Sequence, residues 1–133
     1  MPYPTDRRYT KEHEWIAASG GTATIGITDY AQHELGDVVF VETPKPGTKI
    51  EAGKQFGTVE SVKAVSDIYA PASGEVLEAN GELTNAPEKI NSDPHGAGWL
   101  IKVRLSNFAE LNALMDAAAY EAYIAAHSKE ASA

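Results

Sequence analysis

The sequence of 133 residues contains no cysteine, and its basic residues are few. Without cysteine, disulfide bonds, thiolate catalysis and cysteine-ligated metals are excluded, although the redox compartment stays undetermined. The 11 lysines and arginines face 19 acidic residues, which gives a formal net charge of −8. Because this charge would repel a phosphate backbone, we expect no nucleic acid as a partner.

Long apolar runs are also missing. No stretch approaches the roughly 20 residues of a membrane-spanning helix, and the N-terminus resembles neither a signal peptide nor a transit peptide. We therefore expect no membrane partner, a complete chain and a cytoplasmic location. The hydrophobic fraction of 43% and the charged fraction of 23% are typical of globular proteins. At this length the chain can bury one core, which predicts a single domain over residues 1–133 and a monomer when isolated.

What the sequence does contain is a series of short apolar-alternating runs separated by Gly, Pro, Asn and Asp. This pattern is typical of an antiparallel sandwich or barrel and predicts a mainly β core over about residues 9–105. The expected strands are residues 13–18, 22–27, 38–42, 55–62, 65–69, 74–79 and 100–105. The expected tight turns are Ser19-Gly20-Gly21, Lys45-Pro46-Gly47 and Pro71-Ala72-Ser73-Gly74.

Two segments break the β pattern and predict helices. The first is a short helix near residues 28–35, which Thr28 or Asp29 can cap and Gly36 can end. The second is a C-terminal helical extension over about residues 107–127, which starts like a capping box at Asn107 and Glu110. Its apolar residues recur at helical spacing, with Asp116 as a candidate break.

Several common sites find no support in the sequence. The four histidines have no metal-binding spacing and are interpreted as ordinary surface residues, so no metal is expected. A Gly-x-Ser-x-Gly elbow is absent, but a Ser-His-Asp triad that assembles only in space stays open. The segment Gly96-Ala97-Gly98 is followed by a strand instead of a helix, which indicates a turn and not a phosphate loop. No catalytic residue is therefore assigned.

Lys63 lies between two apolar-alternating arms that can pair as strands with the lysine at their tip. An ordinary solvated lysine is the commoner case, and without Asn-Gly or Asp-Gly only a general turn around residues 62–65 is expected. A tip lysine nevertheless suits a carrier, because a rigid sheet fixes the attachment point while a flexible arm moves between partners. Acylation would also remove the charge of the amine, which lowers the cost of laying the arm against protein.

Several blocks of sequence, in this order, carry a resemblance to a known family: YTKEHEW at 9–15, GITDYAQ at 26–32, LGDVVFVE at 35–42, VESVKA at 59–64 and GEV at 74–76, followed by Asn91 and Gly98-Trp99. They resemble the H proteins of the glycine cleavage system, which are lipoyl carriers. The resemblance covers about residues 9–105, with weaker similarity in the C-terminal helix. It implies a flattened β-barrel or sandwich of the biotinyl/lipoyl-carrier type, with lipoate in amide linkage to Lys63.

The resemblance also implies a non-catalytic carrier that serves three enzymes. The lipoyl disulfide accepts an aminomethyl group when the P protein decarboxylates glycine. The T protein then takes the methylene to tetrahydrofolate, and the L protein reoxidises the dithiol. Glu60 and Gly74 match positions favoured by lipoyl-attaching enzymes, whereas Glu14 and Asp67 match residues that hold the amine of the loaded arm. Glu12 is a further candidate for that pocket by charge alone.

Other interpretations remain open from the sequence. The alternative interpretation of Glu12, Glu14, Glu60 and Asp67 is that they are solvated surface acids, and that of Gly74 is a positive-φ turn glycine. A biotin carrier is disfavoured, because biotinyl lysines usually lie between methionines and Lys63 lies between Val62 and Ala64. An H-like lipoyl carrier for lipoate relay or another redox pathway, an unmodified binding module and a hydrolase are the alternatives. The absence of cysteine is compatible with a carrier, since no internal thiol can trap a dithiol.

Overall fold

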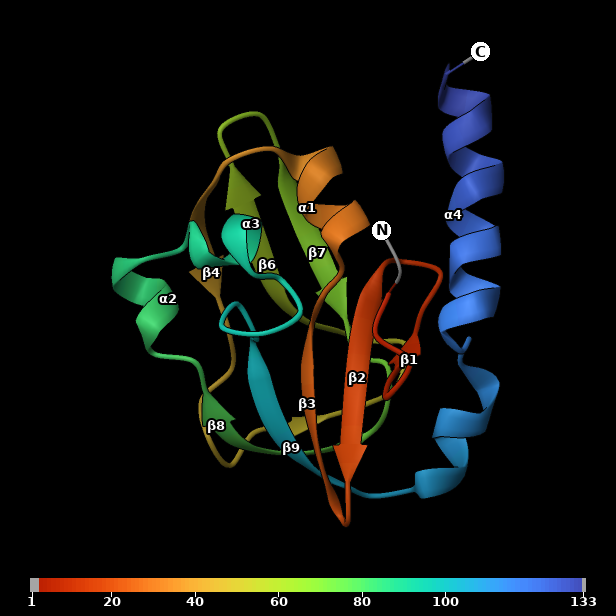
Figure 1. The fold of residues 1–133 in the computed structure, drawn as a ribbon. Coiled ribbons are helices and arrows are strands. Elements are labelled where there is room, and N and C mark those ends of the chain that lie inside the picture. The colour runs from red at the N-terminus through yellow and green to blue at the C-terminus, as the bar shows by residue number, and fades with distance from the viewer. Residues whose placement is uncertain (1–2, 133) are drawn as a thin grey trace.

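The computed structural model describes residues 3–132 as a mainly antiparallel β fold (Figure 1). The strands are β1 (Arg8–Tyr9), β2 (Glu14–Ser19), β3 (Thr22–Ile27), β4 (Val38–Glu42), β5 (Lys49–Ile50), β6 (Gln55–Ser61), β7 (Val65–Tyr69), β8 (Gly74–Ala79) and β9 (Ile101–Leu105). The helices are α1 (Asp29–Leu35), α2 (Glu82–Asn85), α3 (Lys89–Ser92), the 3-10 helix η1 (Phe108–Ala113) and α4 (Ala117–Ser132).

The strands form two sheets that enclose the core as a sandwich. One sheet has six strands in the order β1-β2-β3-β9-β8-β5, and the other has three in the order β4-β6-β7. Alternate side chains such as Ile25, Val76 and Val103 from the larger sheet, and Val59 and Ile68 from the smaller, are buried. The sandwich form of the expected fold is confirmed, but the barrel is not closed. Among the described residues each strand pairing stays within one sheet, and the edge strands β1 and β5 have only two residues each.

The seven strands expected from alternation are all present, with ends shifted by one residue at β2, β6 and β9. The prediction missed β1, β5, α2 and α3, because segments of two to four residues are too short to show a period. Two of the expected turns contain a glycine with positive φ, Gly20 (62°) and Gly47 (92°). Gly81 precedes α2, and the segment around residues 94–98 forms turns, as expected for the glycine-rich stretch.

Helix α1 begins and ends at the expected residues. The hydroxyl Oγ1 of Thr28 accepts a hydrogen bond from the backbone N–H of Ala31 at 3.2 Å, so Thr28 is the cap, not Asp29. Gly36 follows the helix with φ 82°, a conformation that glycine adopts without strain, and its N–H donates to the carbonyl of Gln32. The chain then enters β4 directly.

The expected C-terminal helical extension is present, but its first part is the 3-10 helix η1 and α4 begins only at Ala117. Asn107 caps η1, and Asp116 caps α4 by accepting from the N–H of Ala119 at 2.8 Å, so the break at Asp116 is confirmed. Between the two helices Met115 pairs with Tyr9 through two backbone hydrogen bonds of 2.8 and 2.9 Å, and strand pairing overrides the helical spacing there. Helix α4 continues to Ser132, past the expected end.

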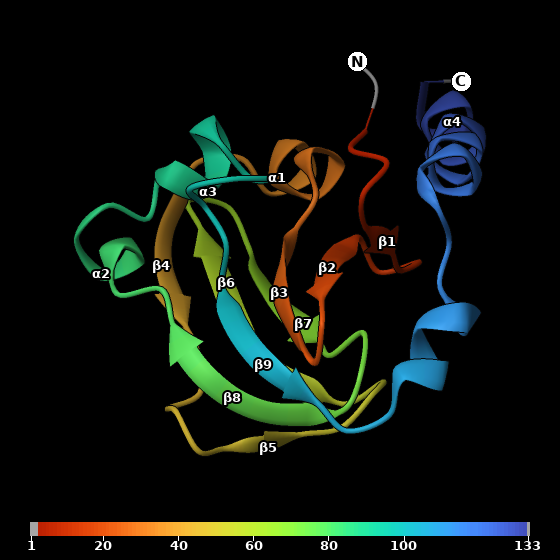
Figure 2. The ribbon, with the colours of Figure 1, turned by 60° about the horizontal axis from the view of Figure 1, so that its bottom comes forward.

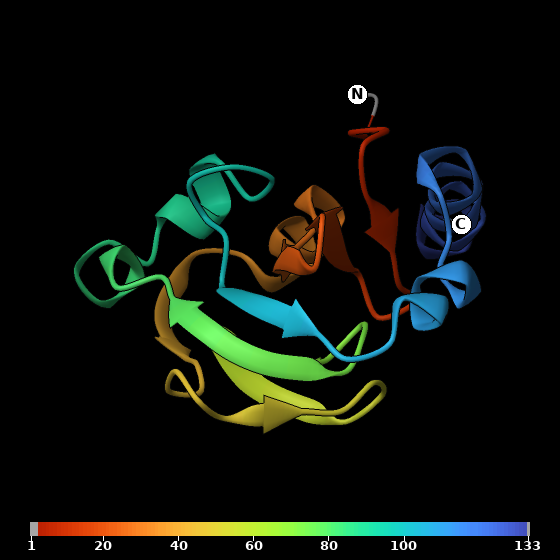
Figure 3. The same ribbon diagram turned by 90° about the horizontal axis from the view of Figure 1, so that it is seen from below.

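Tyr120 holds α4 against the sheets. Its buried ring stacks on Tyr9 with 4.8 Å between centroids, and its hydroxyl is hydrogen-bonded with Thr28 at 2.7 Å and with His13 at 2.8 Å. His13 is therefore half-buried and not the surface histidine that was expected. In Figures 2 and 3 η1 and α4 lie on one side of the sheets, and α2 and α3 lie on the other. Over residues 3–132, no helix combines the length and apolarity needed to cross a membrane.

Candidate functional site

Lys63 lies in the exposed loop that joins β6 to β7, and this loop projects beyond α1 at the top of Figure 1. The two strands are paired up to Glu60 and Val65, and the N–H of Ser61 donates to the carbonyl of Ala64 at 2.8 Å. The expected hairpin with Lys63 at its tip is thus confirmed. Its ε-amine extends from a short loop whose two ends are fixed by a sheet.

The turn at the tip contains no glycine or asparagine, and the side chain of Ser61 stabilises it instead. Its buried hydroxyl accepts from the N–H groups of Lys63 at 3.3 Å and Ala64 at 3.1 Å, and it is within 3.2 Å of the Ala64 carbonyl. No role was predicted for Ser61 from the sequence. A serine at the first position of a four-residue turn is a known signature of such side-chain bonding, and it could have identified this residue.

The segment between α1 and β4 supports the tip from the side. The N–H of Val62 donates to the carbonyl of Asp37 at 3.0 Å. An ideal Cβ built on Gly36 would lie 3.3 Å from Cε of Lys63, so the lysine side chain passes over this glycine. The absence of a side chain at Gly36 therefore leaves room for the side chain of Lys63.

Asn91 of α3 fixes that supporting segment. Its Nδ2 donates to the carbonyl of Gly36 at 2.9 Å and to Oε1 of Gln32 at 3.0 Å, and its Oδ1 accepts from the N–H of Val38 at 2.9 Å. These bonds hold the residues on both sides of Asp37. Asn91 contributed to the family resemblance, but its role could not be predicted from the sequence, because its partners are more than 50 residues away.

Of the two expected recognition residues, only Glu60 lies near Lys63. Glu60 is exposed on β6, where it pairs with Val65 of β7 and Phe40 of β4. Gly74 begins β8 in the other sheet, at the opposite end of the molecule in Figure 1. It is buried and its φ is not positive, so the interpretation as a positive-φ turn glycine is wrong. A Cβ there would collide with the carbonyl oxygen of Arg104, so close packing against β9 requires the glycine.

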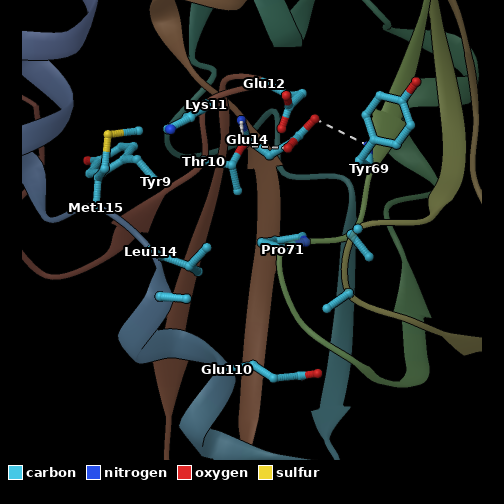
Figure 4. A pocket seen from close by; sticks show the side chains of 14 residues that line it. Tyr9, Thr10, Lys11, Glu12, Glu14, Tyr69, Pro71, Glu110, Leu114 and Met115 are labelled. Atoms are coloured by element: carbon cyan, nitrogen blue, oxygen red, sulfur yellow. Dashed lines mark hydrogen bonds between the residues drawn. The ribbon is translucent and has the colours of Figure 1, made fainter.

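A surface cavity of about 800 Å³ lies between the N-terminal segment, the end of β7 and the region of η1 (Figure 4). Glu14 and Glu12 both line it, together with Tyr69, Lys11 and Met115. Glu14 lies at the inner end of the cavity, between Thr10 and Tyr69, as Figure 4 shows. Asp67 is not among the lining residues; it is exposed on β7 and accepts from Nε2 of Gln55 at 3.0 Å.

Glu14 is a buried carboxyl group and not a solvated surface acid, since only 1% of the residue is exposed. Oε1 accepts from the hydroxyl of Thr10 at 2.5 Å, and Oε2 accepts from the N–H of Tyr69 at 3.2 Å. Burial raises the pKa of Glu14 to about 7, and the hydrogen bonds from Thr10 and Tyr69 oppose this rise. The carboxyl can therefore gain or lose a proton near neutral pH, and its ionised form would attract a cation in the cavity.

Lys63 fits an acyl cofactor through its own chemistry and surroundings. Its amine is exposed, as an acylated lysine requires, and the side chain crosses a position without a Cβ. Across the part of the chain that the structure describes, no group of three or more histidine, aspartate or glutamate side chains is placed to hold a metal ion. The structure thus places an exposed lysine at the tip of a hairpin, with a cavity at the far end of the adjacent strand β7.

Comparisons with known proteins agree with this arrangement. A family model described as Glycine cleavage H-protein matches residues 7–127. The glycine cleavage system H protein of Acidobacterium capsulatum is 64% identical over 124 residues, covering 93% of this chain and 95% of that relative. The one from Caulobacter vibrioides is 57% identical over 117 residues, covering 88% of this chain and 97% of the relative.

A solved structure shares the fold as well. The crystal structure of a glycine cleavage system H protein from Mycobacterium marinum superimposes with a TM-score of 0.82 at 41% sequence identity. The match covers 95% of this chain and 99% of that chain, so both sheets and the helical extension are included. Together with the family model and the curated relatives, this likeness extends over nearly the whole sequence. The chain belongs to the glycine cleavage H-protein family.

Proposed function

We propose that this chain is the lipoyl carrier of a glycine cleavage system and that Lys63 holds lipoate in amide linkage. The observation that carries the proposal is the position of Lys63 at an exposed tip whose backbone is fixed by Ser61 and Asp37. When bound, the lipoyl group supplies the disulfide that accepts the aminomethyl group derived from glycine. The chain itself contributes the attachment point, the direction in which the arm leaves the loop, and a surface that can hold the aminomethyl group.

The cavity beside Glu14 is within reach of such an arm. A strand advances about 3.4 Å per residue, so Tyr69 lies about 14 Å along β7 from Val65. An extended chain advances about 1.2 Å per bond, which gives a lipoylated lysine a reach of about 15 Å. We propose that Glu14 holds the protonated amine of the loaded arm there, with Asp67 flanking the path along β7 and Glu12 at the rim of the cavity.

This pocket would protect the cargo through charge and exclusion of water. The ionised Glu14 carboxylate pairs with an ammonium group, and the cation in turn lowers the pKa of Glu14 from about 7. Entry of the arm near neutral pH therefore releases a proton from Glu14. Occupancy of the pocket should rise as the pH rises from about 6 to about 8.

The carrier role implies the P, T and L proteins as partners, together with the enzymes that attach the lipoyl group. We propose that Glu60, beside the tip, contributes to recognition by the attaching enzymes. The same role for Gly74 stays a prediction, and its contact with the backbone of Arg104 favours a structural reason for the glycine. The monomeric state, the cytoplasmic location and the lack of catalytic activity also stay predictions.

The test is lipoylation of the purified chain by a lipoyl-attaching enzyme, followed by intact mass measurement and peptide mapping. Lys63→Arg keeps the positive charge but offers a guanidinium that stays protonated and cannot act as the amine nucleophile. It should gain no lipoyl group and should support no glycine cleavage with the P, T and L proteins. Lys54→Arg, at another exposed lysine, is the matched control and should behave like the unchanged chain. A lipoyl group on Lys63→Arg would overturn the assignment.

A further inference from the structure

Four large apolar side chains are exposed around Lys63, on the loop, at the start of β7 and on strand β4. Val39, Phe40, Val62 and Val65 have exposed fractions between 49% and 69%. We call these four residues the apolar collar. The other exposed large apolar residues of the described chain are Leu77 and Phe108, which lie on β8 and η1.

Strand register explains why the collar faces solvent. Phe40 pairs with Glu60, and Glu60 pairs with Val65, so these three side chains form one row across the outer face of the smaller sheet. The register shifts between Val38 and Phe40, and this bulge leaves both Val39 and Phe40 exposed where strict alternation would bury one of them. The row ends beside the loop that carries Lys63.

The next row on the same face is acidic. Glu42 pairs with Thr58, and Thr58 pairs with Asp67. Together with Glu60, this face therefore presents three exposed carboxylates, and none of them belongs to an ion pair within the described residues. The apolar collar and these three unpaired acids are complementary to a partner that offers an apolar surface and cationic side chains.

The short reach of the unmodified Lys63 side chain indicates which partner has to contact the collar. The side chain of an unmodified lysine spans about 6 Å, so an enzyme that acylates Nζ has to approach the loop backbone to that distance. An enzyme that acts on the far end of a lipoyl arm works about 15 Å away and needs no contact with these residues. Val62 directly precedes Lys63, and Val65 follows it by two residues. Phe40 shares a row with Val65, so an enzyme that approaches the loop backbone this closely would contact the collar.

We propose that the apolar collar, with Glu42, Glu60 and Asp67, is the docking surface for the enzyme that acylates Lys63. This inference rests on the proposed function. In the step that docking permits, Nζ attacks the carbonyl carbon of an activated acyl donor and forms the amide bond. The bond from that carbon to the leaving group breaks, and the leaving group keeps the electron pair. The amide nitrogen keeps one hydrogen, and its other protons pass to solvent. Phe40, as the large aromatic residue of the row, carries most of the affinity.

The experiment measures kcat and KM for lipoylation of the unlipoylated full-length chain by a lipoate ligase, with lipoate and ATP, followed by intact mass. Phe40→Ser and the nearly isosteric Val65→Thr are compared with Phe108→Ser, whose residue has a similar exposed fraction of 53% but lies on η1. We expect Phe40→Ser to lower kcat/KM about tenfold or more, mainly through KM. Val65→Thr should lower it about threefold, and Phe108→Ser should stay within about twofold of the unchanged chain.

Binding and folding are measured on the same set of proteins. Circular dichroism and thermal unfolding check that each variant is folded, and calorimetry of Lys63→Arg with the ligase should show docking that Phe40→Ser combined with Lys63→Arg loses. If the unchanged chain is lipoylated and the collar variants match Phe108→Ser, the docking surface is wrong and the carrier function stands. If the unchanged chain gains no lipoyl group, both proposals are overturned. A defect seen only with the P protein after lipoylation would also overturn this choice of partner.

Discussion

Gly36 lies beneath the side chain of Lys63, where an added Cβ would come within 3.3 Å of Cε. Gly36→Ala should therefore change the protein in two ways. Its φ of 82° is strained for alanine, and the methyl group would displace the lysine. We expect unfolding free energy to fall by about 1 to 2 kcal/mol and the rate of lipoylation to fall several-fold.

Gly47→Ala separates these two effects. Gly47 has a similar φ of 92° but no atom within 4 Å of an added Cβ. Urea unfolding and the lipoylation rate, followed by intact mass, are measured for both variants. Similar losses of stability with slower lipoylation only for Gly36→Ala are expected. Equal lipoylation rates would mean that Gly36 is required for the backbone alone.

Asn91→Ala should loosen the tip without touching it. The change leaves the N–H of Val38 and the carbonyl of Gly36 without their side-chain partner, which should lower the unfolding free energy by about 2 to 3 kcal/mol. Hydrogen exchange at the N–H of Val62, which bonds Asp37, should speed up more than exchange in β9. Asn112→Ala, at an exposed position, is the control, and uniform acceleration across the sheets would contradict a local role.

Glu14 predicts a stability that falls as the pH rises. Its pKa is about 7 in the folded state and 4.5 ordinarily, so between these values the folded protein binds more protons than the unfolded chain. The stabilisation is complete below about pH 4.5 and is lost as the pH rises through about 7. Relative to Glu14→Gln, the unchanged chain should lose about 3 kcal/mol over this window.

Urea unfolding of both proteins at several pH values checks this dependence. Glutamine can still accept from Tyr69 and donate to Thr10, so the variant should fold. Glu78→Gln, at an exposed acid on β8, should keep the pH dependence of the unchanged chain. A difference between Glu14→Gln and the unchanged chain that stays constant with pH would show that Glu14 titrates normally.

The loaded arm should break down faster when its proposed partners are neutral. Glu14→Gln combined with Asp67→Asn should still accept lipoate on Lys63, and once it is fully lipoylated it should release formaldehyde and ammonia faster from the aminomethyl form, measured without the T protein. The exposed Asp67 should account for at most about a fivefold change, with the rest due to the buried Glu14. Glu78→Gln, an exposed acid on β8, is the control. An unchanged rate in the double variant would remove both residues from the pocket.

The sequence predicted the strands and α1 because their patterns are local. Alternation identifies a half-buried strand, and Thr28 and Gly36 are the residues that a short helix needs at its ends. The burial of Glu14 could not be predicted in this way. Glu14, Trp15 and Ile16 are all buried at the start of β2. Trp15 packs with Tyr9 and Tyr120 on one face. Glu14 lies on the opposite face with Ile16, where its carboxyl group is bound by Thr10 and by Tyr69 from a distant segment.

Lys63 was identified mainly by the blocks of sequence that resemble the family, and less by the alternation of the strands beside it. The pairing of its strands follows from alternation, but the bonds of Asp37 and Asn91 come from segments that are distant in sequence. The η1 region was predicted as the start of a helix because Glu110 fits a capping box. Its carboxylate instead accepts from the N–H and hydroxyl of Ser73 at 2.7 and 2.9 Å, a tertiary contact that local spacing cannot show.

The bond from Tyr69 to Glu14 joins β7 of the smaller sheet to β2 of the larger one through a side chain. The N–H of Tyr69 thus donates to a carboxyl group that gains and loses a proton near pH 7, where in a closed barrel it would donate to a backbone carbonyl of the neighbouring strand. The rate of deuterium exchange at the N–H of Tyr69 therefore measures how often this hydrogen bond between the two sheets opens. Recorded in the empty and the cargo-bearing carrier, it would report arrival of the arm without any label.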